Sequence, residues 1–226
     1  MNDSIQQRLE QLREDVAAHC ARAGRSEDSV RIIAVTKTHP ASVVQKVIDA
    51  GLMDIGENRV QEIEQKVPVL SGSFTMHLIG HLQKNKVNKV VPLVSWIQSI
   101  DSEKLLSRIE TTCERLDKPI NGLVQVNTTG EQSKSGISAE QALELCEKTA
   151  QSRWVRFRGL MTIGPLGGDE KQIRESFAQL RNLGEKCGEL TEKLELSMGM
   201  SSDYGWAIEE GATMIRVGSA LVKRNY

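Results

Sequence analysis

A lysine near the start of the sequence stands where a buried strand should end. Ile32 to Val35 are apolar and mostly β-branched, which is typical of a parallel strand covered on both faces, and Pro40 marks the first turn of a helix. Lys37 lies between the two. Ligands of α/β folds bind at the carboxyl ends of strands, and a desolvated lysine there can act as a nucleophile that forms a Schiff base. The alternative is a side chain that extends into solvent.

An arginine in the last predicted strand is the second candidate for chemistry. In the segment Thr213-Met-Ile-Arg216-Val-Gly218, alternation places Ile215 and Val217 toward the helices and Arg216 toward the inside. A buried guanidinium is costly unless it meets an anion, a carboxylate or a ring nitrogen. We therefore expect either a ligand-facing arginine or an internal ion pair, for example with Glu195.

Small and hydroxyl-bearing residues follow the last two predicted strands. One segment reads Ser197-Met-Gly199-Met-Ser201-Ser202-Asp203 and the other Gly218-Ser219. Barrels commonly bind phosphate at this place, where glycines allow close approach and backbone N–H groups point at the anion. The segments are consistent with a phosphate site, but Ser202 and Asp203 could equally be helix caps.

Other polar residues give weaker indications. His77 and His81 are four apart, but on a strand this spacing spans roughly 13 Å, so we expect no shared metal ion. Gln125 and Asn127 share one face of a strand and could line a cavity or hold a loop. The polar loop that follows, which contains Lys134, is typical of a solvated turn.

Alternating strands and helices would position these residues. The hydrophobic pattern predicts an amphipathic helix over 2–23 and then eight strands, at 32–35, 52–55, 74–79, 95–100, 120–127, 155–163, 194–200 and 213–218. A helix is predicted after each strand but the last, at 41–50, 58–67, 103–116, 138–151, 169–187 and 202–210, together with one that the basic stretch 83–89 starts. Eight such units predict a (β/α)8 TIM barrel with an extra N-terminal helix, in a single domain over residues 1–226. The alternative is a doubly wound open sheet, which usually has fewer strands at this length.

Composition restricts the class of protein. The chain has 226 residues, of which 39% are hydrophobic and 26% charged, and its formal net charge is -1. These are ordinary values for a soluble globular protein, and they indicate no nucleic-acid partner and no membrane surface. Residues 1–20 lack the apolar core of a signal peptide, and no apolar run could span a membrane. The four cysteines occur singly, as in reduced proteins, so we expect a cytoplasmic location.

Several short segments along essentially the whole chain match one family. They are Ala34-Val-Thr-Lys37, Ile55-Gly-Glu-Asn58-Arg-Val-Gln-Glu62, His77-Leu-Ile-Gly-His-Leu-Gln-Lys-Asn-Lys86, Gln125-Val-Asn127, Lys134-Ser-Gly136, Arg158-Gly-Leu-Met161, Ser197-Met-Gly-Met-Ser201 and Arg216-Val-Gly218. With them the sequence resembles the pyridoxal phosphate homeostasis protein family (YggS-type), whose barrel is similar to the N-terminal domain of alanine racemases. The ligand that this resemblance implies is pyridoxal 5′-phosphate.

The resemblance also implies a role for each matching residue. Lys37 would hold pyridoxal 5′-phosphate as a Schiff base, and Asn58 would lie near the phenolic oxygen of the ring. Arg216 would face the pyridine nitrogen and, as a cation, disfavour its protonation, which weakens the ring as an electron sink. The pocket would be completed by Met161 on its wall and by Ser201, Gly218 and Ser219 around the phosphate.

Three functions follow from these expectations. The first is a non-catalytic carrier that stores pyridoxal phosphate or delivers it to pyridoxal-phosphate-dependent apoenzymes. The second is an amino-acid racemase, which needs acid–base groups on both faces of the substrate Cα. Alanine racemases supply the second group as a tyrosine, together with a β-domain for which this chain has no room, and the only tyrosines here are Tyr204 and Tyr226. The third is a phosphosugar enzyme, which would leave Arg216 without a ring nitrogen to face. We expect the carrier, and a monomer, because the racemase dimer interface would be largely missing.

Overall fold

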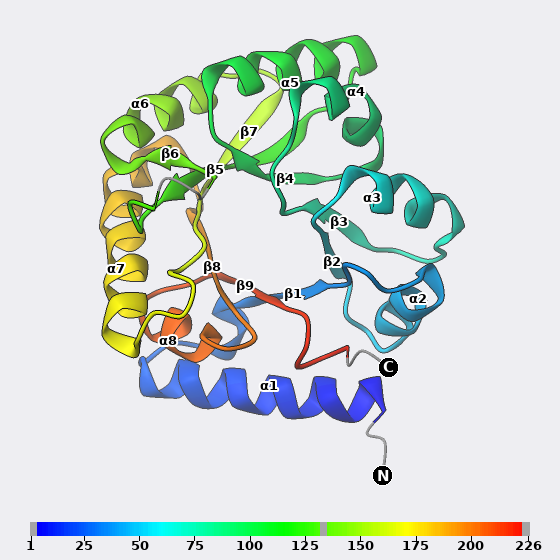
Figure 1. Cartoon of the computed structure of the whole chain (residues 1–226), viewed down its shortest axis with the longest axis vertical. Helices are drawn as coiled ribbons and strands as arrows, with labels where there is room; N and C mark the ends of the chain where they lie inside the picture. Colours follow the sequence, from blue (N-terminus) through cyan, green and yellow to red (C-terminus); the bar gives the residue numbers. More distant parts are fainter. Residues whose placement is uncertain (1–3, 132–134, 223–226) are drawn as a thin grey trace.

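Parallel strands close into a barrel in the computed structural model, which describes residues 4–131 and 135–222 (Figure 1). The order around the ring is β4-β3-β2-β1-β9-β8-β7-β5, and the pairing of β4 with β5 closes it. The eight barrel strands are β1 (Arg31–Val35), β2 (Asp54–Glu57), β3 (Thr75–Leu78), β4 (Trp96–Ile100), β5 (Ile120–Asn127), β7 (Val155–Met161), β8 (Glu195–Met200) and β9 (Met214–Val217). The short β6 (Ile137–Ser138) pairs with β5 beside this ring. The predicted barrel is confirmed.

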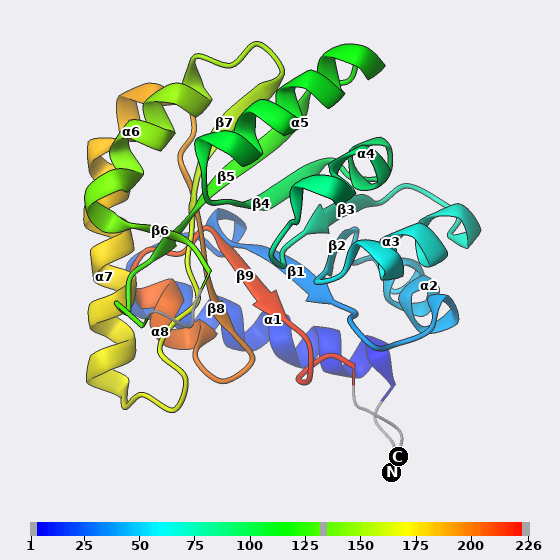
Figure 2. The same cartoon turned by 45° about the horizontal axis from the view of Figure 1, so that its top comes forward.

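Helices cover the outside of the ring (Figures 1 and 2). They are α2 (Ala41–Asp49), α3 (Val60–Lys66), α4 (Val87–Val90), α5 (Glu103–Leu116), α6 (Ala139–Ala150), α7 (Glu170–Lys186) and α8 (Tyr204–Glu209). The expected N-terminal helix is α1 (Ile5–Arg22), which Ser4 caps in a reciprocal pair of hydrogen bonds with Gln7. Both views place α1 outside the ring beside α8, where His19 Nδ1 lies 2.9 Å from Glu209 Oε1.

The apolar core has two parts. The larger lies between the strands and the helices, and Phe177 is its bulkiest fully buried side chain. The smaller is formed by Ile33, Trp96, Leu123, Met161 and Met214, which come from five of the barrel strands. The barrel is therefore a packed core and leaves space for a ligand only at its ends.

Strand β2 begins and ends two residues later than predicted. Its last residue, Glu57, is completely buried, although an acidic residue after a glycine is typical of a turn. The Glu57 carboxylate accepts hydrogen bonds from Lys66 Nζ (2.6 Å) and Thr36 Oγ1 (2.6 Å). Because these partners come from other elements, the hydrophobic pattern could not reveal them.

The helix that the stretch 83–89 is predicted to start is short. Only Val87–Val90 form an α-helical turn, between 3₁₀ turns at Lys84–Lys86 and Val91–Leu93. Pro92 explains the short length, because proline has no N–H to continue an α-helix.

The cysteine side chains belong to the apolar core. All four cysteines are buried free thiols within the larger core, as their scattered positions predict. Within residues 4–131 and 135–222, none of the helices is both long and apolar enough to cross a bilayer.

Candidate functional site

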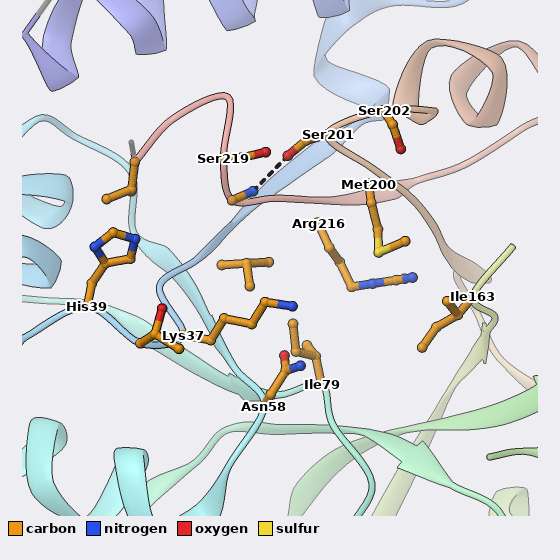
Figure 3. A pocket seen from close by; sticks show the side chains of 14 residues that line it. Lys37, His39, Asn58, Ile79, Ile163, Met200, Ser201, Ser202, Arg216 and Ser219 are labelled. Atoms are coloured by element: carbon orange, nitrogen blue, oxygen red, sulfur yellow. Dashed lines mark hydrogen bonds between the residues drawn. The ribbon is translucent and has the colours of Figure 1, made fainter. Parts of the chain in front are cut away.

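A cavity of about 780 Å³ opens at the carboxyl ends of the barrel strands (Figure 3). Segments that follow β1, β2, β3, β7, β8 and β9 contribute to its wall. All but one of the predicted site residues line it, namely Lys37, Asn58, Ser201, Arg216, Gly218 and Ser219. Along β1, Val35 lines the cavity and Ile33 lies in the inner core, so alternate residues of this strand face the same side as Lys37.

The end of β1 places the amine of Lys37 in the cavity (Figure 3). The side chain is solvent-exposed, and the next residue, Thr38, has a φ of 68°, a left-handed conformation that is rare for a β-branched residue. The Thr38 N–H donates to Glu62 Oε2 at 2.8 Å, which holds this turn. The backbone around Lys37 is therefore fixed by a contact with helix α3.

A buried ionic network supports the same turn. Lys66 Nζ donates to Glu57 Oε1 (2.6 Å), Glu62 Oε2 (2.8 Å) and the Thr36 carbonyl oxygen (3.0 Å). Burial raises the pKa of Glu57, and the hydrogen bonds from Lys66 and Thr36 oppose that effect. The network joins β1, β2 and α3 next to Lys37. Sequence reasoning missed it, and the four-residue spacing of Glu62 and Lys66 on a helix was the one signal that could have indicated it.

Arg216 reaches the cavity from β9 and, as predicted, points inward. Its side chain is buried, with Nη1 donating to Ser197 Oγ (2.7 Å) and Nη2 to the Thr162 carbonyl oxygen (2.7 Å). Burial lowers the pKa of Arg216 to about 10, so the guanidinium stays cationic at neutral pH. The alternative of an ion pair with Glu195 is wrong, because that carboxylate lies 3.8 Å from Arg31 and 3.7 Å from Lys193 instead.

Hydroxyl and backbone donors gather where β8 and β9 end. The Gly218 N–H donates to Ser201 Oγ at 3.1 Å, and Ser219 lies on the same wall of the cavity (Figure 3). A Cβ atom at position 218 would lie only 3.2 Å from the Val35 carbonyl oxygen, so glycine suits this close approach. Asp203 does not cap α8 with its side chain, since its carboxylate accepts from the Met200 N–H.

Met161 is the predicted site residue that is not found on the cavity wall. It is fully buried in the inner core, whereas Ile163, two residues later on the same side of the chain, lines the cavity. The prediction placed the wall one layer too deep in the barrel.

The remaining polar candidates lie elsewhere. Asn127 holds a loop, because its Oδ1 accepts from the backbone of Thr129 and Gly130. Gln125 Nε2 donates to the Ser135 carbonyl oxygen, which also ties it to that loop. Lys134 falls outside the described residues.

Sequence reasoning did not identify several other residues of the cavity wall. They are Thr38, His39, Ile79, Ile163 and Val222. Their position shortly after a strand is the only signal that could have indicated them, as for Ile79 after β3.

One known protein family matches nearly the whole chain. The family described as "Alanine racemase, N-terminal domain" matches residues 7–225. A pyridoxal phosphate homeostasis protein of Aquifex aeolicus is 37% identical over 218 residues, which are 95% of this chain and 96% of that protein.

Solved structures agree. PipY of Synechococcus elongatus, solved with PLP bound, has a TM-score of 0.85 and 35% identity, covering 96% of this chain and 99% of PipY. An alanine racemase of Clostridium difficile has a TM-score of 0.80 at 11% identity, covering 99% of this chain and 57% of the racemase. The racemase therefore shares the fold alone.

Proposed function

The chain belongs to the pyridoxal phosphate homeostasis protein family, and we propose that it stores or delivers pyridoxal 5′-phosphate, held as a Schiff base on Lys37. The observation that carries this proposal is the convergence of Lys37, Arg216, Ser201 and Gly218 on one cavity. Pyridoxal phosphate supplies an aldehyde, with which a primary amine condenses with the loss of one water molecule.

The cavity suits this ligand in size and in its donors. Its volume of about 780 Å³ is in the range of small-molecule sites. Lys37 offers the amine, and the hydroxyls of Ser201 and Ser219 offer donors for a phosphate, with the Ser201 hydroxyl held by the hydrogen bond that its Oγ accepts from the Gly218 N–H. Asn58 lies beside Lys37 and would contact the phenolic oxygen (Figure 3).

The environment of Arg216 supports storage over catalysis. The guanidinium can only donate, so a pyridine nitrogen facing it would remain an unprotonated acceptor. An unprotonated ring withdraws electrons weakly, which disfavours carbanion chemistry on a bound amino acid.

The contacts of Tyr204 also argue against a racemase. Tyr204 donates its hydroxyl to Asp15 and is not a lining residue of the cavity, and Tyr226 lies outside the described residues. A racemase needs a second acid–base group on the other face of the substrate. We propose accordingly that the protein is not an enzyme.

We further propose a monomeric, cytoplasmic, single-domain protein that meets pyridoxal-phosphate-dependent apoenzymes transiently. The buried free thiols are consistent with a reducing compartment. Light scattering during size-exclusion chromatography tests the monomer, and a dimer would refute it.

The test of the cofactor site is the visible spectrum of the protein with added pyridoxal phosphate. We expect a band near ~420 nm, bleached by borohydride, in the wild type and in Lys84→Ala, an exposed lysine beyond β3, but not in Lys37→Ala. A colourless wild type would refute the proposal. Colour retained in Lys37→Ala would move the anchor to another lysine, with Lys134 the next to test. A D/L-alanine exchange assay then separates carrier from racemase.

A further inference from the structure

A continuous chain of hydrogen bonds runs from Arg216 through the barrel interior to β2. Arg216 Nη1 donates to Ser197 Oγ (2.7 Å), which donates to Gln98 Oε1 (2.7 Å). Gln98 Nε2 donates to His77 Nδ1 (3.0 Å), and His77 Nε2 donates to Asp54 Oδ1 (2.9 Å). The chain crosses β9, β8, β4, β3 and β2, and it links the cavity to the opposite mouth of the barrel, where Asp54 is partly exposed.

The two ends of the chain set the direction of every bond in it. A guanidinium has no acceptor, and an ionised carboxylate has no donor. Ser197 must therefore donate toward Gln98, the Gln98 amide must turn its N–H toward His77, and His77 must carry its proton on Nε2. Because all donors point the same way, the bonds strengthen one another.

Burial shields the middle members of the chain from water, and the one of them with a further side-chain hydrogen-bond contact among the described residues is Gln98, whose Nε2 also lies 3.8 Å from Met214 Sδ. Ser197, Gln98 and His77 are all 0% exposed, so water cannot replace a lost bond. Trp96 stacks on the His77 ring, with centroids 5.4 Å apart and planes at 17°, which fixes the ring orientation. Burial also lowers the pKa of His77, in keeping with a neutral ring.

We propose that Asp54, His77, Gln98 and Ser197 are positioning residues for Arg216, so that a carboxylate at one mouth of the barrel orients the guanidinium in the cavity at the other. This inference rests on the proposed function, because it concerns how Arg216 meets the ring of the bound cofactor. Neither Asp54 nor His77 lines the cavity, so both act through the chain.

The structure offers a matched control for Asp54. Glu195 is at the same mouth of the barrel, and like Asp54 it lies 3.8 Å from Arg31. Its carboxylate accepts a hydrogen bond from Thr213 Oγ1 and takes no part in the chain. Asp54→Asn gives position 54 a donor and so removes the acceptor-only end. Glu195→Gln makes the same chemical change outside the chain.

The first measurement is the affinity for pyridoxal 5′-phosphate and the absorbance of the bound form. We expect Asp54→Asn and Ser197→Ala to raise the dissociation constant about tenfold and to shift the absorption maximum. Glu195→Gln should leave both at the wild-type values. Equal spectra and affinities in Asp54→Asn and the wild type would overturn the inference, whereas a wild type that binds no cofactor would refute the proposed function instead.

The second measurement needs no cofactor. Nitrogen-15 NMR of the imidazoles, with His77 assigned by its loss in His77→Gln, should show a neutral ring protonated on Nε2 at pH 7. In Asp54→Asn we expect a mixture of tautomers, and in Glu195→Gln the wild-type signal. A His77 ring protonated on Nδ1 in the wild type would overturn the inference, even where a variant fails to fold.

Discussion

Replacing Lys66 with methionine should test the buried network beside Lys37 most directly. Lys66→Met keeps an unbranched side chain of similar length and removes only the ammonium group. It leaves Glu57 with a single partner, the Thr36 hydroxyl, while Glu62 is partly exposed and can be solvated by water. The variant therefore contains one uncompensated buried carboxylate.

The expected loss follows from the cost of that carboxylate. Removing one partner of a buried ion pair costs about 3–5 kcal/mol, which for a chain of this size lowers Tm by about 10 °C. Without Lys66 the folded-state pKa of Glu57 rises further above its ordinary value of 4.5. The folded variant then binds a proton that the unfolded chain releases, so its free energy of unfolding increases as the pH falls from neutral toward 4.5. The loss should thus be larger at pH 7 than at pH 5.

Thermal and urea unfolding at both pH values are the assay. Lys89→Met is the control, because Lys89 pairs with Glu64 at 3.8 Å on the surface, and we expect it to cost less than about 1 kcal/mol. The double variant Glu57→Gln/Lys66→Met removes both charges and should recover at least half of the loss. A Lys66→Met protein as stable as Lys89→Met, or a double variant worse than the single, would refute this reasoning.

Two further variants probe the packing of the site and the attachment of α8. A Cβ at position 80 would clash with the Asn58 carbonyl oxygen, so Gly80→Ala should cost about 1–3 kcal/mol and weaken binding of pyridoxal phosphate. A Cβ at position 188 would have no atom within 4 Å, so the control Gly188→Ala should change neither urea unfolding nor affinity. Arg174 lowers the pKa of Glu209 from 4.5, so Glu209 stabilises the fold above that pH and its contribution is lost as the pH falls. Glu209→Gln should therefore lower Tm by a few degrees at pH 7 and not at acid pH, and an equal effect at both would contradict this sign.

The sequence was sufficient for the parts of the site that depend on local pattern. A β-branched run followed by Lys37, and the alternation that turns Arg216 inward, are fixed by strand geometry, and both predictions agree with the structure. The ring of strands followed from the repeated alternation of strand and helix patterns.

Contacts between distant elements could not be predicted in this way. The extension of β2 to Glu57 depends on Lys66, and the burial of His77 depends on Gln98 from another strand. A buried polar residue is stable only with its partner, and a single sequence does not show which residue that partner is. The resemblance placed Met161 on the cavity wall, but its depth in the barrel depends on the register of the neighbouring strands, which a single sequence does not show.

The pairing of β1 with β9 has a consequence for how a ligand and the folded chain influence each other. Lys37 follows the first barrel strand, Arg216 belongs to the last and Gly218 follows it, and Ile33 pairs with Arg216 across this seam. The seam joins segments that are far apart in sequence, so its closure has a large chain-entropy cost and depends on the rest of the barrel. A molecule held on both sides binds only the closed ring and shifts the equilibrium toward it. Occupancy of the cavity thus reports on the integrity of the whole barrel, because opening the seam separates the two halves of the site.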